Sequence, residues 1–117
     1  MKPRQLAEAE GRRAEDRAAL VLRLKGWRIL DKRVRTPAGE VDLIARRSGI
    51  VAFIEVKWRA DARALGDAVD EARLARVAAA AESLAHRYLK PGDDMRIDVM
   101  LVAPKRWPRH MENVWLG

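Results

Sequence analysis

The segment Ile50–Trp58 places the strongest constraint on the fold of this chain. It is rich in β-branched residues, and it is apolar on both of its faces except at Glu55 and Lys57. A strand that is apolar on both faces belongs in the middle of a sheet whose two faces are both covered. The sequence therefore predicts a layered α/β fold with this strand at its centre.

The rest of the chain supplies the other elements of such a fold. Apolar residues at helical spacing predict two long helices, over residues 4–25 and 65–89. Runs of β-forming residues between turn residues predict strands at 27–35, 40–46, 50–58, 95–102 and 111–116. The strand after the second helix should run parallel to its neighbour. We expect one domain over residues 1–117, with a mixed central sheet of about five strands flanked by the two helices.

Each predicted helix carries an apolar stripe that should pack on the sheet. In the first helix the stripe is Ala14, Ala18, Val21 and Leu22. In the second helix it is Leu65, Val69, Ala72, Val77, Ala81, Leu84 and Tyr88. Opposite faces of both helices are charged, so we expect one helix on each face of the sheet.

The charge distribution favours nucleic acid as the partner. The formal net charge is +7, and residues 1–36 alone carry eleven Lys and Arg against five Asp and Glu. A basic surface attracts nucleic acid through its phosphates, although a surplus of arginine is also found in merely soluble proteins. The candidate phosphate contacts, which lie around the acidic residues described below, are Lys32, Arg33, Arg35, Arg59 and Arg73.

Composition excludes several classes of site. The chain has no cysteine, so disulfides and thiolate metal sites are excluded and any metal must be held by oxygen or imidazole. His86 and His110 have no partner at metal-ligand spacing, and we expect both at the surface. Residues 1–15 are heavily charged, unlike a signal peptide, and no apolar run could span a bilayer. We therefore expect a cytoplasmic protein without a membrane partner.

Acidic residues occur in two predicted strands where a buried charge would be costly. Alternation places Val41 and Leu43 on one face of their strand and Asp42 on the other. Glu55 and Lys57 share one face of the next strand, and a short hairpin turn brings Asp42 beside Glu55. Two adjacent carboxylates repel each other unless a proton or cation lies between them, and Mg²⁺ or Mn²⁺ accepts such oxygen ligands. Lys57 would then lie where it can orient a water or stabilise charge on a phosphate.

The spacing of these residues resembles a known nuclease signature. Asp42, twelve intervening residues and then Glu55-Val56-Lys57 resemble the PD-(D/E)XK motif. Over residues 11–115 the chain also resembles the YraN family of small bacterial proteins, which is related to Holliday junction resolvases. The matching positions are Gly11, Ala14, Glu15, Ala18, Gly26, Gly39–Ala45, Phe53–Lys57, Gly66 and Arg96–Val99.

This resemblance implies a restriction-endonuclease-like fold and a Mg²⁺-dependent or Mn²⁺-dependent endonuclease that acts on DNA. It implies that Asp42, Glu55 and Glu15 are metal carboxylates and that the Val56 carbonyl is a further ligand. Lys57 would be the catalytic lysine. The family often has a lysine early in the second helix, where this chain has Arg73.

Plainer interpretations of single residues stay open. Asp42, Glu55 and Lys57 could form a buried ion-pair network without metal. Glu15 could be a solvated or paired charge on its helix. Glu40 is expected to end a strand or pair with an arginine, and Asp98 to hold a loop or pair with an arginine.

Two other functions also stay open. The chain could be a nucleic-acid-binding or accessory module without turnover, or its basic face could bind an acidic protein. Trp27 and Trp58 could stack on bases, although packing is the commoner role. Trp107 and Trp115 either close the core or line a partner surface. Alanine-rich helix faces are compatible with a homodimer.

Overall fold

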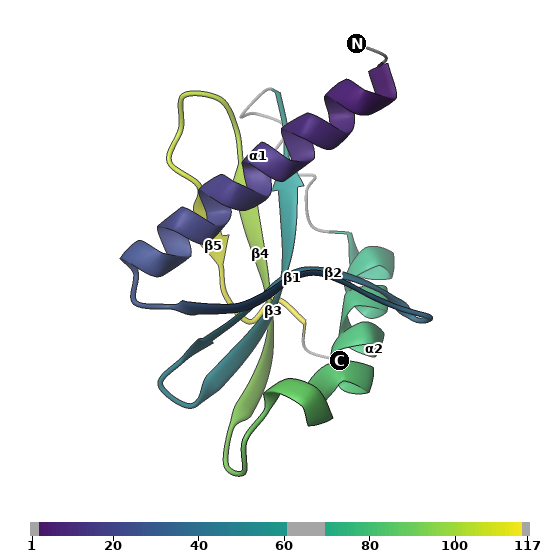
Figure 1. Cartoon of the computed structure of the whole chain (residues 1–117), viewed down its shortest axis with the longest axis vertical. Helices are drawn as coiled ribbons and strands as arrows, with labels where there is room; N and C mark the ends of the chain where they lie inside the picture. Colours follow the sequence, from purple (N-terminus) through teal and green to yellow (C-terminus); the bar gives the residue numbers. More distant parts are fainter. Residues whose placement is uncertain (1–2, 61–69, 116–117) are drawn as a thin grey trace.

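The computed structural model describes residues 3–60 and 70–115 of the chain (Figure 1). The predicted α/β fold is confirmed, with a five-stranded mixed sheet and two long helices. The elements in chain order are α1 (Pro3–Leu24), β1 (Arg28–Thr36), β2 (Gly39–Arg47), β3 (Ile50–Trp58), α2 (Glu71–Tyr88), β4 (Asp94–Val102) and β5 (Arg109–Met111).

The sheet has β3 at its centre, as its apolar sequence predicts. The strand order is β1-β2-β3-β4-β5. Only the β3–β4 pair is parallel, and the other neighbours are antiparallel. The connection from β3 to β4 contains α2, so the predicted crossover is confirmed.

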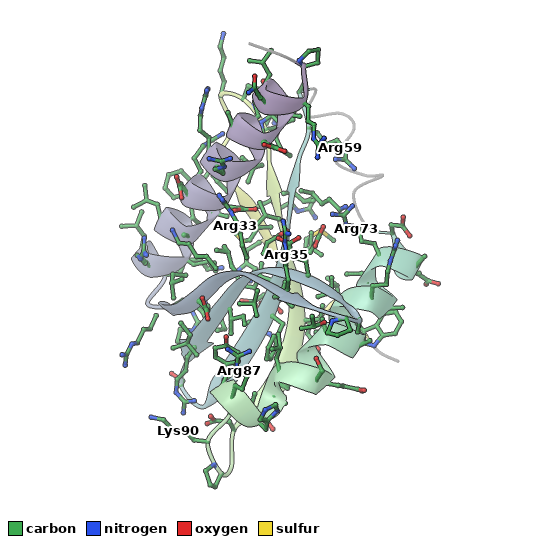
Figure 2. The ribbon with its side chains drawn as sticks, turned by 45° about the vertical axis from the view of Figure 1, so that its right-hand side comes forward. Arg33, Arg35, Arg59, Arg73, Arg87 and Lys90 are labelled. Carbon is green, nitrogen blue, oxygen red and sulfur yellow. The ribbon has the colours of Figure 1, made fainter. Side chains whose placement is uncertain are left out.

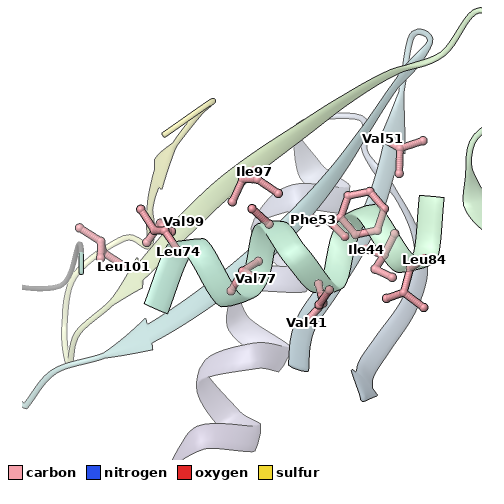
Figure 3. Packing of buried hydrophobic residues seen from close by; sticks show 13 residues of the cluster. Val41, Ile44, Val51, Phe53, Leu74, Val77, Leu84, Ile97, Val99 and Leu101 are labelled. Atoms are coloured by element: carbon pink, nitrogen blue, oxygen red, sulfur yellow. The ribbon is translucent and has the colours of Figure 1, made fainter. Parts of the chain in front are cut away.

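The core has two layers, one on each face of the sheet. On one face α2 packs on β2, β3 and β4 through residues such as Val77, Phe53 and Ile97 (Figure 3). On the other face α1 packs through Leu22 against residues such as Ile54. Each large side chain buried in this way contributes about 1.5–3 kcal/mol. The predicted stripe of α1 is buried in full.

The second helix begins later than its apolar pattern predicts. Asp70 is extended and forms the N-cap, because its Oδ1 accepts hydrogen bonds from the backbone N–H groups of Ala72 (2.9 Å) and Arg73 (3.4 Å). An aspartate that caps a helix in this way stabilises its start. In the predicted stripe Ala72 is wrong, since it is exposed, and the buried Leu74 was missed. Leu65 and Val69 lie outside the described residues.

The last strand also differs from the prediction. It spans Arg109–Met111 rather than residues 111–116. The buried carboxylate of Asp98 on β4 holds this segment, because it accepts hydrogen bonds from His110 Nε2 (2.7 Å), the Asn113 N–H (2.8 Å) and Arg96. The prediction that His110 lies at the surface is therefore wrong, whereas His86 is exposed as predicted. Asp98 holds the irregular segment after β5 and pairs with Arg96, as expected for it.

Gly39 begins β2 where the backbone of α2 comes closest. A Cβ atom on Gly39 would lie 3.0 Å from the backbone oxygen of Arg76. We expect Gly39→Val to destabilise the fold by about 1–3 kcal/mol, because neither backbone can move cheaply. Gly11→Ala is the control: a Cβ there meets nothing within 4 Å, and alanine should stabilise α1 by roughly 0.5–1 kcal/mol. Urea denaturation measures both. Equal effects of the two substitutions would contradict the close approach.

Candidate active site

The site lies where β2 separates from β3. The backbone pairing of these strands ends at Leu43 and Ile54. The Asp42 side chain then takes over, and its Oδ2 accepts a hydrogen bond from the backbone N–H of Val56 (2.7 Å). Asp42 thus spans the gap that opens between the two strands.

Regular alternation fails at this level of β2. Val41 belongs to the core layer under α2, whereas Leu43 belongs to the layer under α1. The prediction that Val41 and Leu43 share a face is therefore wrong. Arg33, which lies between the pairs that flank Asp42 in the β1–β2 register, has a φ of 51°. This left-handed conformation is rare for arginine, and both strands leave regular geometry together.

The backbone of Val56 faces the same gap. In a strand the N–H and C=O groups of one residue point to the same side. Because the Val56 N–H reaches Asp42, the Val56 carbonyl also points toward the side that β2 has left. Residues at an odd spacing from Val56 point the other way: the N–H of Arg59, three positions further on, donates to the Val102 carbonyl on the β4 side (2.9 Å).

Glu55 is a buried carboxylate that contacts two cations. Its side chain is 3% exposed, and its Oε1 atom lies 3.3 Å from Lys57 Nζ and 2.7 Å from Arg73 Nε. Glu55 and Lys57 share the face toward α2, as predicted. Neither contact has hydrogen-bond geometry, so within the described residues Glu55 Oε1 is buried without a hydrogen bond. An oxygen in this state can accept a further ligand.

Glu55 lies close enough to Asp42 to affect the ionisation of Asp42. Burial raises the pKa of Asp42 to about 7, and the negative charge of Glu55 adds to this effect. The hydrogen bond from Val56 acts in the opposite direction, while Glu15 and Glu40 raise the pKa further. A carboxyl poised near neutral pH beside a second acid is typical of functional sites.

A cavity of about 260 Å³ opens onto these acids. It is lined by Gly39, Glu40, Asp42, Glu55, Arg73, Arg76 and Val77. Sequence reasoning missed Arg76, although its spacing of three from Arg73 places both on one face of the helix. Glu40 lies 3.7 Å from Arg35, which agrees with its expected pairing.

Glu15 approaches the site from the opposite helix. Its carboxylate contacts Arg33 Nε on β1, and its side chain is 14% exposed. Its charge acts on Asp42. In the described ranges 3–60 and 70–115, no three Asp, Glu or His side chains form a metal-binding group by themselves. A metal here would need the Val56 carbonyl as well as Asp42 and Glu55.

Most of the predicted phosphate contacts are already neutralised. Lys32 lies 3.5 Å from Asp16, and Arg33 contacts Glu15. Arg35 is paired with Glu40, and Arg73 is paired with Glu55.

Figure 2 shows Arg33, Arg35, Arg59 and Arg73 in the upper half of the molecule, with Arg87 and Lys90 at the other end. Arg59 Nη1 donates to the Trp58 carbonyl (2.9 Å).

Comparison with known proteins identifies the family. The sequence profile of the uncharacterised protein family UPF0102 matches residues 14–102. The chain belongs to this family. It is 64% identical over 112 residues to the UPF0102 protein of Sphingopyxis alaskensis, which covers 96% of this chain and 97% of the relative. It is 59% identical over 112 residues to the relative from Erythrobacter litoralis, with the same coverage of the two chains.

A third UPF0102 protein, from Rhizorhabdus wittichii, is 57% identical over 117 residues, which is 100% of this chain and 99% of the relative. The UPF0102 family is the YraN group, so the resemblance seen in the sequence is confirmed. The profile spans Glu15, Asp42, Glu55 and Lys57. In the described part of the chain, no helix is long and apolar enough to cross a membrane.

Proposed function

We propose that this UPF0102 protein is a metal-dependent phosphodiester hydrolase with a restriction-endonuclease-like fold that cleaves DNA. The observation that carries the proposal is the gap between β2 and β3. There the Asp42 carboxylate accepts a hydrogen bond from Val56, the charge of Glu55 acts on Asp42, and the direction of the Val56 N–H implies that the Val56 carbonyl faces the same side. Three oxygen groups in a partly buried gap suit a hard divalent cation.

The donor set fits Mg²⁺ or Mn²⁺. The raised pKa of Asp42 indicates a carboxylate whose negative charge lacks full compensation, and Glu55 offers an oxygen without a hydrogen bond. Asp42, Glu55 and the Val56 carbonyl would hold the cation, with Glu15 as a more distant carboxylate. When bound, a divalent cation lowers the pKa of water and offsets charge on a phosphate. Arg73 would have to leave Glu55 Oε1 for the cation to bind.

The remaining residues would orient the reactants. A water attacks phosphorus, a new P–O bond forms and the bond to the leaving sugar oxygen breaks. Lys57, which lies beside Glu55, would orient the water and stabilise charge on the phosphate. Arg73 and Arg76 line the cavity and can bind the phosphate by their planar guanidinium groups. The left-handed Arg33 supports the assignment, since unusual backbone conformations cluster at functional sites.

Cleavage of single-stranded, duplex, flapped and four-way-junction DNA with Mg²⁺ or Mn²⁺ tests this proposal. We expect wild type to cleave at least one substrate, and Glu55→Gln and Lys57→Ala to reduce the rate by about two orders of magnitude or more. Glu40→Gln is the matched control, because Glu40 lines the same cavity, pairs with Arg35 and has the smallest of the effects on the pKa of Asp42. Equal rates for wild type and Glu55→Gln would refute the assignment.

A second candidate function is a nucleic-acid-binding module without turnover. The contacts of Lys57 and Arg73 with Glu55 favour it, because they neutralise the carboxylate without metal. Such a protein would bind DNA with strong salt dependence in EDTA. It would give no metal-dependent product with any of the four DNA forms.

A further inference from the structure

Positive charge without a carboxylate partner gathers at the connection between β4 and β5. In contrast to Lys32, Arg33, Arg35 and Arg73, the cations Lys105, Arg106 and Arg109 form no ion pair within the described residues. Uncompensated charge is what attracts a polyanion at long range. The connection is therefore better suited to phosphate than these four paired cations.

An exposed tryptophan lies within this charged connection. Trp107 is 71% exposed, whereas Trp27 is 3% exposed. Trp58 and Trp115 are partly buried against the two core layers. Trp107 lines a hollow of about 610 Å³ together with Pro104, Lys105 and Arg106, and the core does not use its ring. An exposed aromatic ring beside cations is the arrangement with which proteins bind unpaired bases.

The connection is held in place by α1. Arg17 donates from Nη1 to the carbonyl of Ala103 (3.2 Å) and from Nη2 to the carbonyl of Arg106 (2.7 Å). Pro104 and Pro108 restrict the backbone at its two ends. A surface that is already ordered loses less entropy when a ligand binds.

Two neighbouring features extend this surface. A second hollow, of about 220 Å³, shares Pro104 and is lined also by Glu10, Arg13, Ala14, Arg17 and Trp58. Val102, the last residue of β4, pairs with Trp58 of β3, so the connection leaves the sheet at the end where Lys57 lies. Figure 1 shows this connection beside α1.

We propose that Lys105, Arg106 and Trp107, with Arg13 and Arg17 of α1, bind an unpaired nucleotide of a DNA strand. The ring of Trp107 stacks on the base, and the cations contact the flanking phosphates. The inference rests on the proposed function in that the partner is nucleic acid, and it adds that the preferred form has unpaired bases.

Fluorescence anisotropy in EDTA tests this surface separately from cleavage. The probes are a fluorescein-labelled oligothymidylate and a labelled duplex of equal length. We expect Trp107→Ala to weaken binding of the single strand by about tenfold and binding of the duplex by less than about twofold. Trp107→Phe should restore most of the affinity, since it keeps an aromatic ring.

Two charge variants complete the test. Lys105→Ala should weaken binding of both probes, whereas Lys90→Ala, a matched exposed lysine at the other end of the molecule (Figure 2), should change neither. Unchanged single-strand binding in Trp107→Ala, or equal losses for both probes, would overturn the proposal and leave Trp107 for a protein contact. Binding that depends on Trp107 without any cleavage would contradict the proposed nuclease activity but support the proposed binding surface.

Discussion

Asp42→Asn is expected to make the metal-free protein more stable at pH 8. In wild type the pKa of Asp42 is raised from 3.8 to about 7, first by burial and then by Glu55. The folded state therefore binds more protons than the unfolded state between these two values, and stability falls as the pH rises through them. Asparagine removes this cost, and its side-chain oxygen can still accept the Val56 hydrogen bond.

The expected gain is on the order of 3 kcal/mol at pH 8, which corresponds to roughly 10 °C in Tm, and it is small near pH 4. Thermal unfolding in EDTA at the two pH values measures it. Mg²⁺ should raise the Tm of wild type but not that of Asp42→Asn, and cleavage should be lost. A variant less stable than wild type at pH 8 would contradict the raised pKa of Asp42 that burial and the charge of Glu55 produce.

Asp98→Ala is expected to cause the largest loss of stability. Asp98 is fully buried, and its removal would leave the buried His110 ring and the half-buried Arg96 without this acceptor. Loss of one partner from a buried ion pair costs about 3–5 kcal/mol. Chemical denaturation followed by tryptophan fluorescence measures this loss.

Glu112→Ala is the control for this prediction. Glu112 lies 3.6 Å from Arg96 Nη2, but its side chain is 45% exposed, so its loss should cost less than about 1 kcal/mol. Equal effects of the two substitutions would contradict the central role of Asp98.

The ionisation of Asp98 adds a pH dependence of the opposite sign to that of Asp42. Burial alone would raise the pKa of Asp98, but hydrogen bonds from His110, Arg96 and Asn113 outweigh it and lower the pKa. The stabilisation is therefore complete above the ordinary pKa of aspartate and is lost as the pH falls below it. Asp98→Asn should lose less stability than wild type on acidification.

The sequence predicted the sheet and the proximity of the two acids because both depend on local patterns. The apolar run of β3 placed that strand at the centre, and the short turn at Ser48 and Gly49 determined which residues of β2 lie beside it. The start of α2 could also have been found, since Asp70 before Glu71 is a common N-cap sequence. The predicted helix instead began at Leu65, because apolar residues at helical spacing continue before Asp70.

Other features depend on contacts between distant residues. Asp42 turns into the gap because β2 and β1 both leave regular geometry beside Arg33, and alternation contains no sign of this. His110 is withdrawn from solvent by Asp98 and by Lys25, whose Nζ donates to His110 Nδ1 (2.7 Å). The pairing of Lys32 and Arg33 with acids of α1 likewise requires the tertiary fold.

The hairpin of β2 and β3 has a consequence for insertions and deletions. Asp42 directly precedes, and Glu55 directly follows, the last backbone pair of Leu43 with Ile54. Residues inserted at the turn between Arg47 and Ile50 would lengthen the loop and leave that pair unchanged. One residue inserted within either strand would reverse the face of every side chain beyond it. The interval between the two acids can therefore change at the turn, whereas their distance from the last backbone pair is fixed.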